Sequence, residues 1–135
     1  MGDRIELPLP TNATIQGPLL EFGGSSLQDS SLLVKYDHEH QDGRIEWAQV
    51  RFRGVLAFEY RQFAACEAEQ IGGSRELARL HESPWLEARR RAWDEAVGSQ
   101  KWQQLQGGAK RFQHFRIYFD DVGCVDVAAE IASIG

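Results

Sequence analysis

The stretch "HFRIYFDDVGCVDV", residues His114–Val127, decides the fold of this chain. Apolar and polar residues alternate through both of its halves, and "DDVG" separates the halves. A period of two is that of a strand with one buried face, and Asp and Gly are residues that tight turns favour. The stretch therefore predicts a β-hairpin that turns near residues 121–123, with Cys124 paired to Asp120.

The same hairpin also holds the side chains of a candidate active site. His114 is a possible base for a Cys124 nucleophile, and three carboxylates accompany them: Asp120, Asp121 and Asp126. A nucleophile needs its base within hydrogen-bonding reach, but His114 lies about 20 Å along its strand from the turn. We therefore interpret Asp120 and Asp121 as turn residues and Cys124 as a small buried hydrophobe, and we predict no catalytic residues and no enzyme activity.

Two more segments upstream have the character of strands. Residues 31–37, "SLLVKYD", are followed by Asp42-Gly43, a dipeptide that favours hairpin turns, and by the long apolar-rich run 45–61. Gly54 interrupts that run, and glycine within a strand pattern marks a bulge or a sharp bend. The run predicts one long bent strand or two consecutive strands.

A single clear helix is expected over residues Pro84–Val97. Ser83 is a good N-cap, Pro84 suits the first helical position, and Gly98 falls where a helix ends. The preceding "ELARLHES", residues 76–83, predicts either one helical turn or a short strand. The arginine triplet 89–91 is typical of a solvated helix face rather than of a nucleic-acid site.

These elements together predict an α+β fold. A largely antiparallel sheet of about six strands is expected to pack on the one main helix. Residues 31–135 form this single domain. Residues 1–30, rich in Pro, Gly and Ser, form an irregular N-terminal arm with room for one edge strand around Ile15–Phe22.

Composition indicates a small cytoplasmic protein. The chain has 135 residues, of which 42% are hydrophobic, and no apolar run approaches the length of a membrane span. No signal peptide is apparent. Only two cysteines occur, Cys66 and Cys124, without a CxxC pair, which favours a reduced compartment.

The formal net charge of −5 comes entirely from residues 1–50, which hold eight acids and three bases. Four of these acids surround the predicted Asp42-Gly43 turn: Asp37, Glu39, Asp42 and Glu46. An acidic cluster on the outer surface favours a basic protein partner and disfavours nucleic acid. A solvated turn that binds nothing is the alternative, and the sequence leaves both open.

No cofactor or metal is predicted. His38 and His40 lie two residues apart, so both point to one face of a strand, but no third ligand for zinc is identifiable. The glycine-containing segments lack the spacing of phosphate-binding loops.

Four segments resemble a family of small, largely uncharacterised bacterial proteins. The matching segments are "FRGVLAF" at Phe52–Phe58, Cys66, "SPWL" at Ser83–Leu86, and "HFRIYFDDVGCVDVAAE" at His114–Glu130. The resemblance spans about 80 residues and implies that residues 76–83 lead into the helix as a strand. Small bacterial proteins of this kind are suspected to be immunity proteins for toxins.

Three classes of function follow from these observations. The first is a non-catalytic immunity protein that occludes a basic toxin, with Asp37, Glu39, Asp42 and Glu46 at the interface. The second is a regulatory or structural module that binds another protein. The third is an enzyme that uses His114 with a cysteine, which requires a pocket that holds the two together.

Overall fold

The computed structural model of the chain describes residues 3–9, 14, 17–26, 29–66, 76–81, 83–97, 112–120 and 122–135. In chain order its elements are the strands β1 (Asp3–Glu6), β2 (Leu19–Gly23), β3 (Ser31–Glu39) and β4 (Ile45–Gln62), the 3-10 turn η1 (Phe63–Ala65), β5 (Glu76–Leu80), the helix α1 (Pro84–Val97), β6 (Gln113–Phe119) and β7 (Gly123–Ile134).

The strands form a single sheet in the order β1-β5-β6-β7-β4-β3-β2. Every neighbouring pair is antiparallel. The prediction of a mostly antiparallel sheet with one helix is confirmed, although the sheet has seven strands rather than about six.

Strand β4 is the long bent strand that the sequence predicted. Gly54 has φ of +63°, a conformation that glycine adopts without strain, and its N–H donates to Ser30 O at 3.0 Å. The pairing of β4 with β7 shifts register between Val55 and Ala57, as at a β-bulge. The strand therefore changes direction in its middle while it stays paired.

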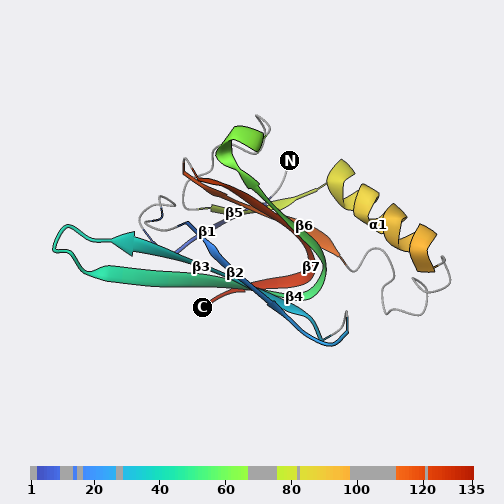
Figure 1. Cartoon of the computed structure of the whole chain (residues 1–135), viewed down its shortest axis with the longest axis horizontal. Coiled ribbons are helices and arrows are strands. Elements are labelled where there is room, and N and C mark those ends of the chain that lie inside the picture. Colours follow the sequence, from blue (N-terminus) through green and yellow to red (C-terminus); the bar gives the residue numbers. More distant parts are fainter. Residues whose placement is uncertain are drawn as a thin grey trace.

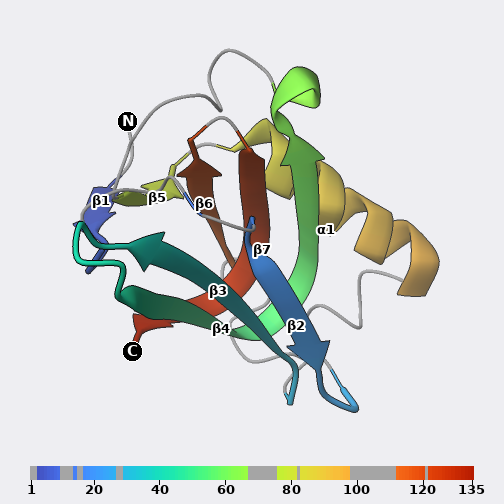
Figure 2. The same cartoon turned by 60° about the vertical axis from the view of Figure 1, so that its left-hand side comes forward.

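This bend folds the sheet over on itself, so that its two halves face each other across the core (Figures 1 and 2). Phe52 on β4 meets Phe115 on β6, with ring centroids 5.5 Å apart, and Tyr36 on β3 meets Phe119 on β6 at 5.4 Å. The apolar residues enclosed between the halves include Leu32, Val34, Val50, Leu77, Ile117, Val125 and Val127.

The helix plays a smaller part in the packing than the sequence suggested. Figure 1 shows α1 outside the folded sheet. Leu86 packs there in a second, small cluster with Phe112 and Ala128, next to the partly buried Leu56 and Trp85. The sheet does pack on the helix, as expected, but through this small cluster only, because the curled sheet buries its larger apolar face on itself.

Two described segments of residues 1–30, β1 and β2, are strands of the sheet. Strand β2 lies near the expected edge strand, but β1, at the opposite edge, was not expected. Leu7 and Leu9 are fully buried in the main core. Among the described residues, therefore, position 30 marks no boundary in the packing.

The C-terminal hairpin has the predicted strands with a shifted turn. Cys124 pairs with Tyr118 rather than with Asp120, because the turn closes by a hydrogen bond from Val122 N–H to Phe119 O. Centring the turn one residue earlier moves the pairing by two residues, so each side chain keeps its face.

The ambiguous segment before the helix is a strand, β5, as the resemblance implied. Gly98, the expected end of the helix, lies outside the described residues.

Gly123 provides a test of the close approach between β7 and β4. A Cβ atom at this position would overlap the carbonyl oxygen of Arg61 and lie 2.9 Å from Tyr60 Oη. We expect Gly123→Ala to lower the free energy of unfolding by about 3 kcal/mol, measured by urea denaturation. Gly23→Ala is the matched control, because a Cβ there meets nothing within 4 Å. Equal stability of the two variants would contradict the packing described.

Candidate functional site

The outer face of the C-terminal hairpin carries polar side chains. His114 and Arg116 on β6, and Cys124 and Asp126 on β7, alternate with residues of the main core. Arg116 pairs directly with Asp126 across the two strands. The two-residue period that predicts the hairpin therefore also gathers these four polar side chains on one face.

Asp126 lies at the centre of a buried hydrogen-bonded network. Its side chain is 2% exposed, and Oδ1 accepts hydrogen bonds from His114 Nε2 at 2.6 Å and from Arg116 Nε at 2.8 Å. Burial raises the pKa of Asp126, but the hydrogen bonds and charges of His114 and Arg116 outweigh burial and hold that pKa below its usual value. Asp126 is therefore ionised at neutral pH, and Nε2–H of His114 donates to it.

The other ring nitrogen of His114 connects this network to the helix. His114 Nδ1 lies 2.6 Å from Ser83 Oγ, and the same oxygen accepts a hydrogen bond from Leu86 N–H at 3.0 Å. Ser83 is thus the N-cap that the sequence predicted. Because Asp126 and His114 belong to β7 and β6, the cap also ties the start of α1 to the sheet.

Trp85 adds a second connection between the helix and the sheet. Its indole ring stacks on the His114 ring, with centroids 4.6 Å apart and a tilt of 32°, and its Nε1–H donates to Glu59 Oε1 at 3.0 Å. Glu59 also accepts a hydrogen bond from Arg61 Nε at 3.2 Å. The first turn of α1 is therefore held by polar contacts to β4 and β6, and through His114 it is linked to Asp126 of β7. We call the four connected side chains of Ser83, Trp85, His114 and Asp126 the polar bracket.

Ser83, His114 and Asp126 have the connectivity of a nucleophile, a base and an orienting carboxylate. The sequence analysis paired His114 with a cysteine and interpreted Ser83 only as a cap, so it did not identify this set. Two features oppose catalysis. His114 is 1% exposed, and Ser83 Oγ already accepts the hydrogen bond that caps the helix.

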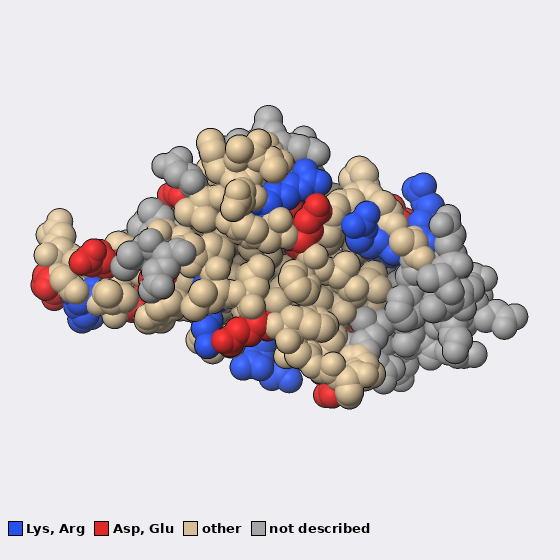
Figure 3. Space-filling model, in the orientation of Figure 1, with Lys and Arg blue, Asp and Glu red and all other residues tan. Residues whose placement is uncertain are grey.

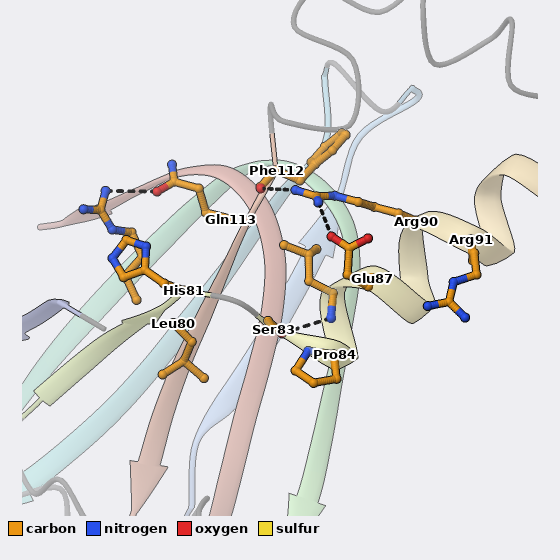
Figure 4. Close-up of a pocket in the computed structure, with 11 residues that line it drawn as sticks. Leu80, His81, Ser83, Pro84, Glu87, Arg90, Arg91, Phe112 and Gln113 are labelled. Carbon is orange, nitrogen blue, oxygen red and sulfur yellow. Dashed lines mark hydrogen bonds and ion pairs between the residues drawn. The ribbon is translucent and has the colours of Figure 1, made fainter. Parts of the chain in front are cut away.

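A surface cavity of about 500 Å³ opens beside Ser83 (Figure 4). Several basic residues line it, but two of its arginines bond to other lining residues. Arg90 donates to Glu87 Oε1 and to Phe112 O, and Arg79 Nη1 donates to Gln113 Oε1 at 3.0 Å. Neither His114 nor a cysteine lines this cavity. The cavity therefore lacks the histidine–cysteine pair that the enzyme hypothesis requires.

The two cysteines lie side by side, which the sequence did not predict. Cys66 Sγ is 3.5 Å from Cys124 Sγ, and both are free thiols. Cys124 is fully buried and donates to Asp126 Oδ2 at 3.9 Å, while Cys66 is only partly buried. Burial, the hydrogen bond shared with Cys66 and the negative charge of Asp126 favour the protonated form and raise the pKa of the Cys124 thiol.

The four predicted partner-binding acids do not share one surface. Asp37 is fully buried and accepts a hydrogen bond from Thr14 Oγ1 at 2.5 Å, so its expected place on the outer surface is wrong. Glu39, Asp42 and Glu46 are exposed near the tip of the β3–β4 hairpin, where Figure 3 shows acidic side chains around a basic one. We call these three residues, with Ile45 and Trp47, the hairpin tip.

The exposed acids of the hairpin tip have local partners. His40 Nε2 lies 2.8 Å from Glu46 Oε1, and Arg44 Nε lies 3.8 Å from Asp42 Oδ2. Lys35, on the same strand as Glu39, pairs with Glu21 at 3.1 Å. The acidic charge of the tip is therefore lowered locally but not removed.

Among the described residues, no three His, Cys, Asp or Glu side chains are grouped to hold a metal ion. The rings of His38 and His40 contact each other edge to face, with centroids 4.7 Å apart. No helix in the described part of the chain has the length and apolarity of a membrane span.

Comparison with known proteins gives no match to a family model, a curated protein or a solved structure. The resemblance to small bacterial immunity-type proteins therefore stays a prediction.

The lowered pKa of Asp126 predicts a pH-dependent contribution to stability. We expect Asp126→Asn to lower the free energy of unfolding by about 3 kcal/mol at pH 7, because it leaves buried donors without their charged acceptor. A carboxyl group with a lowered folded pKa stabilises the fold above its unfolded pKa of about 4 and loses that effect below it. The difference between the two proteins should therefore narrow as the pH falls from about 5 toward 3.

Urea denaturation across that pH range measures this difference. Asp42→Asn serves as the control, because Asp42 is exposed and an amide oxygen can still accept the hydrogen bond from Arg44 N–H. A difference between wild type and Asp126→Asn that stays constant from pH 7 to pH 3 would contradict the role given to the carboxylate.

Proposed function

We propose that this chain is a non-catalytic, protein-binding protein, and specifically an immunity protein that binds a toxin with a basic surface and occludes it. The observation that carries the proposal is the hairpin tip. There Ile45 and Trp47 stay 52% and 45% exposed beside the acidic side chains. Large apolar groups next to charge are the combination that protein interfaces use.

The hairpin tip suits the docking of a protein rather than of a small molecule. The β3–β4 hairpin extends beyond the rest of the sheet (Figure 1), so a partner can approach it freely. Ile45 and Trp47 lie two residues apart on one face of β4, and Glu39 pairs directly with Ile45. Trp47 also borders a hollow of about 300 Å³ that Leu19 and Lys35 help to line.

The acids and the apolar residues have different expected roles in binding. Exposed charges act mainly on the association rate, because they steer a basic partner toward the site. A tryptophan that becomes buried acts mainly on the dissociation rate. We place this binding in the cytoplasm, because the chain has only two cysteines and no CxxC pair. A regulatory module that binds another protein by the same tip is the alternative.

Charge reversal at the hairpin tip tests the steering role. The protein is first used to capture its partner from the natural host, and the purified partner is then used for binding kinetics. We expect the triple variant Glu39→Lys, Asp42→Lys, Glu46→Lys to lower the association rate at least ~10-fold at low salt, and less at high salt. Trp47→Ala should raise the dissociation rate about 30-fold.

The control reverses Glu6, Glu76 and Glu87 to lysine, which makes the same change in net charge on β1, β5 and α1 rather than on the β3–β4 hairpin. Melting temperatures of all variants check that they fold. An unchanged association rate in the tip variant would exclude the tip from the interface. Failure of the protein to relieve growth arrest caused by its partner would favour the regulatory module.

The Ser83–His114–Asp126 connectivity favours a second candidate, a serine hydrolase. Capping α1 and fixing the helix to the sheet already account for these contacts. We therefore expect a fluorophosphonate probe to leave Ser83 unlabelled. Ser83→Ala should instead lower the free energy of unfolding by about 2 kcal/mol, because the helix loses its cap and His114 loses a partner. Mass spectrometry that finds probe on Ser83 in wild type, and none in Ser83→Ala, would replace the binding proposal.

A further inference from the structure

The paired cysteines lie where the end of β4 folds back over the C-terminal hairpin. After β4 ends at Gln62, Phe63 N–H donates to Val122 O at 2.8 Å, and η1 reverses the chain. This brings Cys66 next to Cys124 on β7, 58 residues away in sequence, with the sulfur atoms 3.5 Å apart. Both side chains thus meet through tertiary contacts rather than through a local motif.

We propose that Cys66 and Cys124 are a redox-active pair, which forms an intramolecular disulfide by exchange with a low-molecular-weight disulfide. The sulfur atoms are already in contact, and a disulfide bond of about 2.05 Å requires them to approach by only about 1.5 Å. Cys66 follows a turn of three exposed residues, Phe63–Ala65, so this side of the pair has room to move.

The exposure of the two thiols sets the order of the steps. Cys66 is partly buried, so the external disulfide reaches it first, whereas Cys124 is enclosed. The Cys66 thiolate attacks one sulfur of the external disulfide, forms a mixed disulfide and expels one thiolate. The sulfur of Cys124 then attacks the Cys66 sulfur and expels the second thiolate.

The reaction balances in atoms and electrons. The two protein thiols lose two electrons and two protons, and the external disulfide gains them to become two free thiols. The raised pKa of Cys124 makes the second step the slower one, because only a small fraction of that thiol is ionised at neutral pH. The mixed disulfide at Cys66 should therefore accumulate briefly.

Oxidation would also change the polar bracket. Cys124 gives its S–H to Asp126 Oδ2 in the reduced protein, and a disulfide removes this donor while His114 and Arg116 still bind Oδ1. The new bond closes a loop that contains β5, α1 and β6. We expect this closure to outweigh the lost donor and to raise the melting temperature by about 10 °C.

Exchange with glutathione disulfide tests the proposal on the full, untagged chain. The reduced, folded protein is incubated with mixtures of glutathione and its disulfide, quenched with acid, alkylated and analysed by intact mass. We expect the loss of two hydrogen masses with no alkylation, preceded by a species that carries one glutathione. Thermal melting of the oxidised and reduced forms measures the stabilisation.

Two variants assign the steps. Cys124→Ser should stop at the mixed disulfide on Cys66, and Cys66→Ser should react many-fold more slowly because Cys124 is buried. If a variant fails to fold, the intact-mass result for the wild-type protein decides the test. Full alkylation of both thiols after incubation in the most oxidising mixture would overturn the proposal, and so would a disulfide that links two chains.

Discussion

The bend of β4 at Gly54 is the constraint on which the other features depend. Because β4 pairs with β3 on one side and β7 on the other, a change in its direction turns the whole sheet. A sheet with one apolar face needs a second layer to cover that face. Here the second layer is the other half of the same sheet, as the contact between Phe52 and Phe115 shows. The 14-residue helix is therefore not needed to close the main core.

A helix that buries little apolar surface needs other contacts to fix its position. The polar bracket supplies them, since Ser83 caps the helix while it pairs with His114, and Trp85 reaches Glu59. A buried carboxylate is costly unless its lone pairs are satisfied. Asp126 meets this condition with donors from two residues of β6. Its cost is thus offset by hydrogen bonds that also set the direction in which the helix leaves the sheet.

Local pattern predicted the features that depend on neighbours in the sequence. The alternation of apolar and polar residues predicted the hairpin of β6 and β7. Gly54 predicted the bend of β4, and Ser83 predicted the N-cap of α1. Sequence pattern did not predict the contacts between segments that are far apart in the chain. Asp37 has the sequence context of a surface acid, but in the fold it is buried and accepts a hydrogen bond from Thr14. Ser83 contacts His114, which lies 31 positions away in the sequence. The cysteine pair was missed for the same reason, since only the reversal at η1 brings Cys66 back to β7.

The hairpin tip and the thiol pair occupy opposite ends of β4 (Figure 1). Trp47 lies near the start of the strand, and Cys66 follows its end by four residues. At physiological salt, charges in water are screened over about 8 Å, so the charge of the tip does not act on the thiols directly. Coupling between the ends would require β4 to have two arrangements that each end favours differently. The ladder of paired residues along β3 and β7 holds β4 in one register. We therefore expect the proposed partner binding and the proposed thiol oxidation to be independent of each other unless the bend at Gly54 itself moves.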